Sequence, residues 1–101
     1  MGTGFVGILS LELYFPESHS LKEKRMHVRS LKAQLQKRVG CSVAEVDHHE
    51  TWQRSRLTLS LVARELGEAE RLLDEAERLV RGRDYDVLAC ERGTVSLDDE
   101  A

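Results

Sequence analysis

Lysine and arginine side chains are concentrated between Leu21 and Val39, at spacings that bring them together on a helix. The segment holds seven cations and one acid, Glu23, so its local charge is +6, whereas the whole chain has a net charge of −3. A cationic helix face can neutralise the phosphates of a nucleic acid and release their counterions. The candidate phosphate-binding residues of the segment are Lys22, Arg25, Arg29, Lys32 and Lys37.

Two other interpretations of this basic face stay open. A second expected helix, from about Glu68 to Gly82, carries an excess of acids. Oppositely charged helices can pair across their seam, although exposed ion pairs contribute only about 0–1 kcal/mol each. The face can also bind an acidic protein, because a local charge excess more often marks where a partner docks than which reaction is catalysed.

Asp47, His48, His49 and Glu50 form a run of side chains that are individually able to bind metals. Adjacent histidines on a turn rarely point at one ion, and a catalytic zinc site usually needs three protein ligands with an ordered surrounding shell. We therefore interpret the run as a polar hairpin turn, and we expect no metal and no other cofactor.

Trp52 follows this turn and precedes Gln53 and Arg54. A tryptophan can stack on a base or anchor a protein contact, but it can also cap one end of a core, and we favour the structural role. Period-two counting places Arg54 and Arg56 on the face of the sheet that carries no helices. These two arginines are further candidate contacts to nucleic acid.

The elements that must position these residues follow from hydrophobic periodicity. Alternating leucines indicate strands, Pro16 ends the first of them, and Ser20 with Glu23 resembles a capping box at the start of the first helix. Strands are predicted over residues 5–15, 41–47, 56–62 and 85–91, and helices over residues 21–39 and 68–82. This order predicts an α+β ferredoxin-like fold, a four-stranded antiparallel sheet of order 4-1-3-2 with both helices on one face.

Residues 1–92 are expected to form a single domain, followed by an acidic, frayed tail over residues 93–101. No apolar run approaches the roughly 20 residues of a membrane span, so we expect a cytoplasmic protein with no membrane partner. Cys41 and Cys90 should lie about 14 Å apart on opposite edge strands. That separation exceeds the roughly 7 Å that a disulfide tolerates between Cα atoms, so we expect no bridge.

Catalysis of the acylphosphatase type is an alternative at this size and topology. Its phosphate-cradling loop would follow the first strand, but the connection from Pro16 to Ser20 has no glycine and places Glu17 where an anion would sit. Cys41 and Cys90 lack a CxxC context or a neighbouring base. We therefore expect no enzymatic activity.

Three sequence blocks carry a family resemblance: Ser20–Arg25 (SLKEKR), Val43–Val46 (VAEV) and Trp52–Arg54 (WQR). Together they resemble the YlxP-like proteins, a small bacterial family of unknown function, over most of the chain. The resemblance implies a ferredoxin-like fold and no established reaction. Because genes of that family commonly sit beside those for a translation initiation factor and ribosome-binding factor A, it also implies a link to translation or ribosome maturation.

The function expected from these patterns is non-catalytic binding of structured RNA, with the small ribosomal subunit as the candidate partner. The alternative is a homodimeric interaction or regulatory module, because Val6, Ile8 and Val62 make the helix-free sheet face partly apolar. The paired aromatics of an RNA-recognition sheet are absent from that face, so base stacking on the sheet is not expected.

Overall fold

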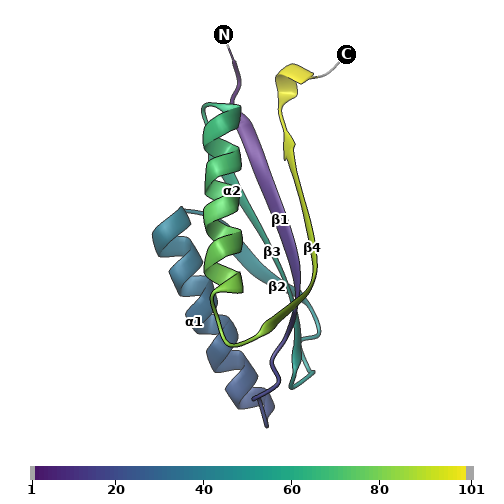
Figure 1. The fold of residues 1–101 in the computed structure, drawn as a ribbon. Coiled ribbons are helices and arrows are strands. Elements are labelled where there is room, and N and C mark those ends of the chain that lie inside the picture. The colour runs from purple at the N-terminus through teal and green to yellow at the C-terminus, as the bar shows by residue number, and fades with distance from the viewer. Residues whose placement is uncertain (1, 100–101) are drawn as a thin grey trace.

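The structure is a computed structural model that describes residues 2–99, and its elements follow the predicted βαββαβ order (Figure 1). They are β1 (Phe5–Tyr14), α1 (Leu21–Val39), β2 (Ser42–Asp47), β3 (Arg54–Ala63), α2 (Leu66–Arg81), β4 (Asp86–Val95) and the short 3-10 helix η1 (Leu97–Asp99).

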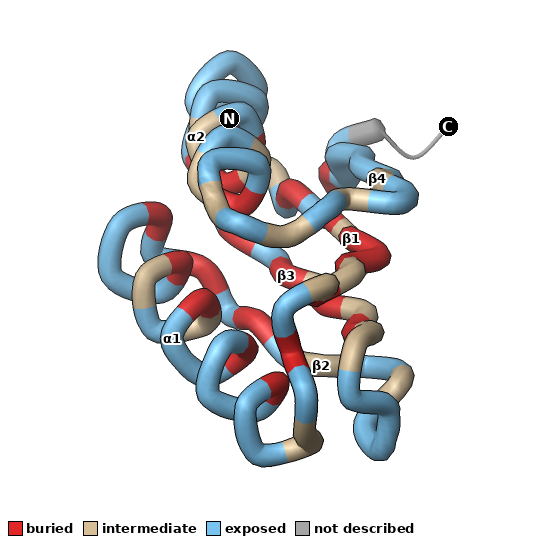
Figure 2. Tube along the Cα trace, turned by 60° about the horizontal axis from the view of Figure 1, so that its bottom comes forward, coloured by how far each residue is buried: buried red, intermediate tan, exposed pale blue. Residues whose placement is uncertain are grey.

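The four strands form one antiparallel sheet in the order β2-β3-β1-β4, which is the predicted order read from the opposite edge. The central strand β1 pairs with β3 without interruption from Phe5↔Ala63 to Tyr14↔Arg54. Both helices cover the same face of the sheet (Figures 1 and 2). The predicted ferredoxin-like α+β fold is therefore confirmed.

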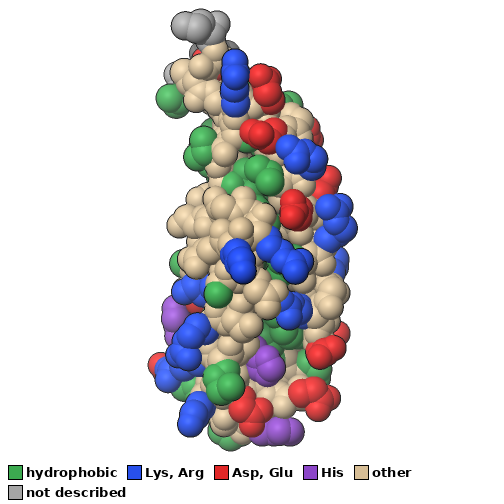
Figure 3. All heavy atoms as spheres, turned by 90° about the vertical axis from the view of Figure 1, so that its left-hand side faces the viewer, with side chains coloured by type: hydrophobic (Ala, Val, Ile, Leu, Met, Phe, Trp, Pro, Cys, Tyr) green, Lys and Arg blue, Asp and Glu red, His purple; other side chains and the backbone are tan. Residues whose placement is uncertain are grey.

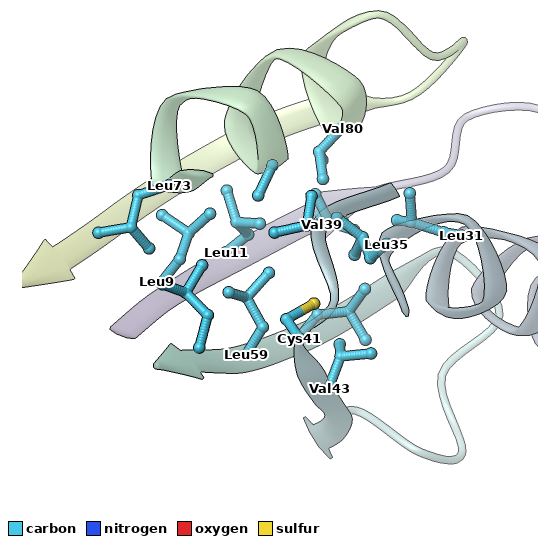
Figure 4. Close-up of a cluster of buried hydrophobic side chains, with 14 of the residues drawn as sticks. Leu9, Leu11, Leu31, Leu35, Val39, Cys41, Val43, Leu59, Leu73 and Val80 are labelled. Carbon is cyan, nitrogen blue, oxygen red and sulfur yellow. The ribbon is translucent and has the colours of Figure 1, made fainter. Parts of the chain in front are cut away.

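The core lies between this sheet face and the two helices. Alternate leucines of β1 and β3 point into it, and one stripe of each helix closes it, as the labelled side chains of Figure 4 show. Its fully buried members include Leu9, Leu11, Leu13, Leu31, Leu35, Leu57, Leu59, Leu73 and Val80. Fully burying one such side chain contributes about 1.5–3 kcal/mol, so this core is the main source of stability.

No helix within residues 2–99 has the length and apolar character needed to cross a membrane.

The C-terminal strand is longer than predicted. β4 continues beyond Glu91 to Val95, pairing Gly93 with Ile8 and Val95 with Val6. The expected frayed tail is therefore wrong for residues 93–95, which the ladder to β1 holds in place. After the strand, the Asp98 carboxylate accepts a 2.8 Å hydrogen bond from the backbone N–H of Thr3. Residues 100–101 of the expected tail lie outside the described residues.

The two cysteines are placed as predicted, near opposite edges of the sheet. Cys41 immediately precedes β2 and Cys90 lies on β4, the two outer strands, and both thiols are free. Cys41 is part of the buried core.

Candidate nucleic-acid interface

Helix α1 begins and ends at the residues that its sequence predicts. The Ser20 side chain accepts a hydrogen bond of 3.1 Å from the N–H of Glu23, and the Glu23 carboxylate accepts one of 3.3 Å from the N–H of His19. Gly40 ends the helix in the left-handed conformation, at φ 74°, which glycine adopts without steric cost. The caps fix where α1 begins and ends, and its buried stripe, which includes Val28 and Leu35, sets the side that faces the sheet.

Lys24 belongs to the buried stripe of α1, although its charge counts toward the basic segment. Its side chain is 0% exposed, and its Nζ donates to Glu45 Oε2 on β2 at 2.7 Å and to the carbonyl of His48 at 2.9 Å. The Ser55 hydroxyl donates to the same Glu45 oxygen at 2.6 Å. The sequence carried a signal for this burial, because Lys24 follows Leu21 by three positions and precedes Val28 by four.

The β2–β3 turn is attached both to α1 and to the β1–α1 connection. Lys24 holds it from the helix side, and the Gln53 side chain donates to the carbonyls of Pro16 and Ser18, each at 3.2 Å. The carbonyl of Gln53 also accepts from the N–H of Phe15 at 2.8 Å. The turn, the connection and the first turns of α1 therefore form one hydrogen-bonded unit.

The remaining cations of α1 are turned away from the core. Lys22, Arg29 and Lys37 are exposed, Lys32 is half-buried, and within residues 2–99 none of the four takes part in an ion pair. Arg25 reaches only the largely exposed carboxylate of Glu50, at 3.6 Å. Figure 3, which looks onto the side of the molecule where α1 lies, shows blue side chains from its middle to its lower left edge, and others among red side chains higher up. The candidate phosphate-binding residues of α1 are thus available to a ligand.

Three acidic side chains of α2, those of Glu68, Asp74 and Glu77, form ion pairs with residues outside α1. Asp74 lies 2.8 Å from Arg92 of β4, and Glu77 contacts both Arg92 and Arg81. The hydrogen bond from Arg81 lowers the pKa of Glu77 and outweighs the effect of burial. No ion pair among the described residues joins α1 to α2, so the interpretation that the two helices neutralise each other finds no contact to support it.

Arg54 and Arg56 lie on the helix-free face as predicted, but their charges are compensated there. Arg54 donates to Glu12 Oε2 from Nη2 at 2.7 Å and from Nε at 3.1 Å. Arg56 contacts both Glu12 and Glu91, and His48 Nε2 lies 2.7 Å from Glu12 Oε2. Arg54 and Arg56 are therefore less available to phosphates than the exposed cations of α1.

This cluster changes the acidity of Glu12. Burial by itself raises the pKa of the Glu12 carboxyl, but the hydrogen bond from Arg54 and the charges of His48 and Arg54 together hold it below the ordinary value. Glu12 is therefore ionised near neutral pH, and it balances the arginines beside it.

Trp52 is exposed on the β2–β3 turn, so the expected role in the core is wrong. Its exposed fraction is 57%, and its ring is absent from the buried cluster. The histidines of the same turn are used internally, since His48 contacts Glu12 and His49 Nε2 lies 3.0 Å from the carbonyl of Glu45. The residues described contain no group of three potential metal ligands.

A cavity of about 180 Å³ lies beside the other flank of α1, between Phe15, His27 and Tyr85. The ring centroids of Phe15 and Tyr85 are 4.6 Å apart, and those of Phe15 and His27 are 5.8 Å apart.

Burial raises the pKa of the Tyr85 hydroxyl and of the thiols of Cys41 and Cys90. These groups are therefore protonated near neutral pH and are not activated nucleophiles.

The fold and the charge distribution define a small ferredoxin-like α+β protein with one solvent-exposed cationic helix. The chain belongs to the family described as "Protein of unknown function (DUF503)", whose model matches residues 6–92. The comparison with curated proteins gave no match.

The solved structures that are similar in fold include the following two. A structural-genomics protein, YJCS, is 11% identical, with a TM-score of 0.54, 89% of this chain covered and 98% of that chain covered. The de novo designed protein Foldit4 is also 11% identical, with a TM-score of 0.51 and coverages of 91% and 96%. At this identity the likeness extends to the fold alone.

Proposed function

We propose that this protein binds structured RNA without catalysing a reaction, through the cationic face formed by Lys22, Arg25, Arg29, Lys32 and Lys37. The observation that carries the proposal is that four of these cations are solvent-exposed and Lys32 is half-buried. Among residues 2–99 their one carboxylate contact is the 3.6 Å approach of Arg25 to Glu50. A net-acidic chain that keeps an uncompensated basic helix face presents a localised site for an anionic polymer.

The geometry of α1 suits a phosphate backbone. Lys22 and Lys37 are separated by about 22 Å along the helix axis, at 1.5 Å per residue. Cations spread over that length can reach several phosphates, and such contacts fix position and orientation rather than read sequence. The proposal therefore concerns a backbone-binding surface and assigns no sequence preference.

The small ribosomal subunit is the candidate source of this RNA. The resemblance to YlxP-like proteins supports it, because genes of that family commonly neighbour those for a translation initiation factor and ribosome-binding factor A. The blocks that carry the resemblance also build this region: Ser20 caps α1, Lys24 pairs with Glu45, and Gln53 holds the β1–α1 connection.

The test is co-sedimentation with small ribosomal subunits at about 50 and 200 mM salt. Four phosphate contacts predict a roughly 100-fold loss of affinity over that range. A variant carrying Lys22→Glu, Arg25→Glu and Arg29→Glu should abolish binding. The matched control carries Arg64→Glu, Arg71→Glu and Arg78→Glu. These exposed positions lie on α2 or just before it, the net charge changes by the same amount, and this variant should still bind. A folded α1 variant that binds like the wild type would overturn the proposal.

A second candidate function is homodimerisation through the helix-free sheet face. Val62, Val6 and Val95 are direct neighbours across β3, β1 and β4, and Val62 is 75% exposed. The charges of Glu12, Arg54, Arg56 and Glu91 on this face are paired with one another, so a second copy can cover them without burying a lone charge. Sedimentation equilibrium should show a concentration-dependent mass that Val62→Lys abolishes, and a constant monomer mass would exclude this function.

A further inference from the structure

We infer that the RNA is single-stranded where it meets the protein, with an unpaired base stacked on the ring of Trp52. The inference rests on the proposed function, since it names the kind of RNA that the same surface accepts. It starts from Trp52, the sole tryptophan of the chain, which exposes 57% of its surface on the β2–β3 turn.

The turn that carries Trp52 is held in place on both sides of the ring. Before Trp52, the Lys24 ammonium donates to the carbonyl of His48 at 2.9 Å, and the N–H of Thr51 donates to the same carbonyl at 3.1 Å. After it, the Gln53 side chain donates to the carbonyls of Pro16 and Ser18. The ring therefore projects from an ordered turn, and binding does not bear the cost of ordering a loose loop.

The backbone position of Trp52 is also near Arg25, at one end of the cationic face of α1. The Glu50 carboxylate lies 3.6 Å from Arg25, and Trp52 follows Glu50 by two residues. Consecutive Cα atoms are 3.8 Å apart, so the Cα of Trp52 lies within about 7.6 Å of that of Glu50. An aromatic platform beside lysines and arginines is the combination that binds single strands, with bases on the ring and phosphates on the cations.

The exposed ring favours an unpaired base over a duplex. Bases inside a duplex are stacked on their neighbours, whereas those of loops and single strands have a free face for an aromatic side chain. The helix-free sheet face is a poorer platform, because it carries the paired charges of Glu12, Arg54 and Arg56 and its aromatic residue Tyr14 is half-buried beside them. Stacking on one aromatic side chain typically changes affinity by about 5- to 150-fold.

The experiment uses the full chain and two probes, a single-stranded oligouridine of roughly 12 nucleotides, in the size range of one binding module, and an RNA duplex of equal charge. Because Trp52 is the sole tryptophan, its emission reports the ring directly. The single strand should quench the emission and the duplex should not. By anisotropy, Trp52→Ala should weaken single-strand binding by about 5- to 150-fold and leave duplex binding unchanged, while Trp52→Phe should retain most of the affinity.

Each outcome separates this inference from the proposed function. Salt-sensitive binding of both RNAs with unchanged emission and no effect of Trp52→Ala would overturn the inference and leave the proposed function standing. An equal loss of duplex affinity in Trp52→Ala would also overturn it, because the contact would then not be with an unpaired base. No binding of either probe or of small ribosomal subunits at low salt would overturn both. Circular dichroism of the variants verifies that the fold is intact.

Discussion

The Nζ atom of Lys24 on α1 lies 2.7 Å from the Oε2 atom of Glu45 on β2, and the lysine side chain is wholly enclosed. This ion pair joins two residues that are 21 positions apart, and the carbonyl of His48 and the hydroxyl of Ser55 complete its hydrogen bonding. One cation of the basic helix is therefore structural, and it connects the helix to the turn that presents Trp52.

Replacing Lys24 with methionine should destabilise the protein by about 3–5 kcal/mol, because it leaves the largely buried carboxylate of Glu45 without its counter-charge. The double variant Lys24→Met/Glu45→Met should recover part of that loss, since it removes both charges. Urea denaturation of the wild type, the two single variants and the double variant measures both quantities. A loss below about 1 kcal/mol for Lys24→Met would contradict the structural role.

Arg29→Ala and Arg54→Ala should have opposite consequences. Arg29 is exposed and has no ion-pair partner among residues 2–99. Its loss should lower the salt slope of single-strand RNA binding by about 0.7 and change stability by less than about 0.5 kcal/mol. Arg54 makes two hydrogen bonds to Glu12, so its loss should cost about 1–3 kcal/mol of stability without affecting RNA binding. Urea denaturation measures the stability of both variants, and RNA titration at several salt concentrations measures their salt slopes. A large stability loss in Arg29→Ala, or a lower salt slope in Arg54→Ala, would contradict the prediction.

The depressed pKa of Glu12 predicts a loss of stability in acid. An unfolded glutamate titrates near 4.5, whereas Arg54 and His48 lower the pKa of the folded carboxyl against the effect of burial. The stability contributed by ionised Glu12 is therefore fully present above about pH 4.5 and is lost as the pH falls through the folded pKa. Because Glu77 has a lowered pKa as well, the measurement is the difference between wild type and Glu12→Gln, by urea denaturation at several pH values. Identical pH dependence in the two proteins would refute the assignment to Glu12.

Gly7→Ala should destabilise the core, because an added Cβ would lie 3.1 Å from Leu61 Cδ1 and 3.1 Å from two carbons of Leu73. Overpacking of this kind typically costs about 1–3 kcal/mol. Gly67→Ala is the matched control, since a Cβ there meets no atom within 4 Å, and alanine in a helix is favoured over glycine by up to about 1 kcal/mol. Thermal unfolding should therefore shift in opposite directions for the two variants, and equal shifts would contradict the packing argument.

The sequence was sufficient for the arrangement of the fold because the signals involved are local. The alternation of Leu57, Leu59 and Leu61 marks the buried side of β3, and Ser20 with Gly40 marks the two ends of α1. The longer β4 was missed because residues 93–95 have little apolar pattern of their own. They are held by pairing with β1, which is a contact between segments far apart in the chain.

The candidate site was only partly predictable for the same reason. Sequence alone determined that α1 carries a basic face and that Arg54 and Arg56 lie on the helix-free side of the sheet, because helix and strand periods decide which side chains share a face. Only the tertiary structure decided which of those charges are free. Strand register sets Arg54 beside Glu12, 42 residues away, and helix packing encloses Lys24 against Glu45, while Lys22 and Arg29 keep their charges in solvent. The face on which a side chain lies follows from the period of its own helix or strand, which is local in sequence. Its ion-pair partner follows from how distant segments pack.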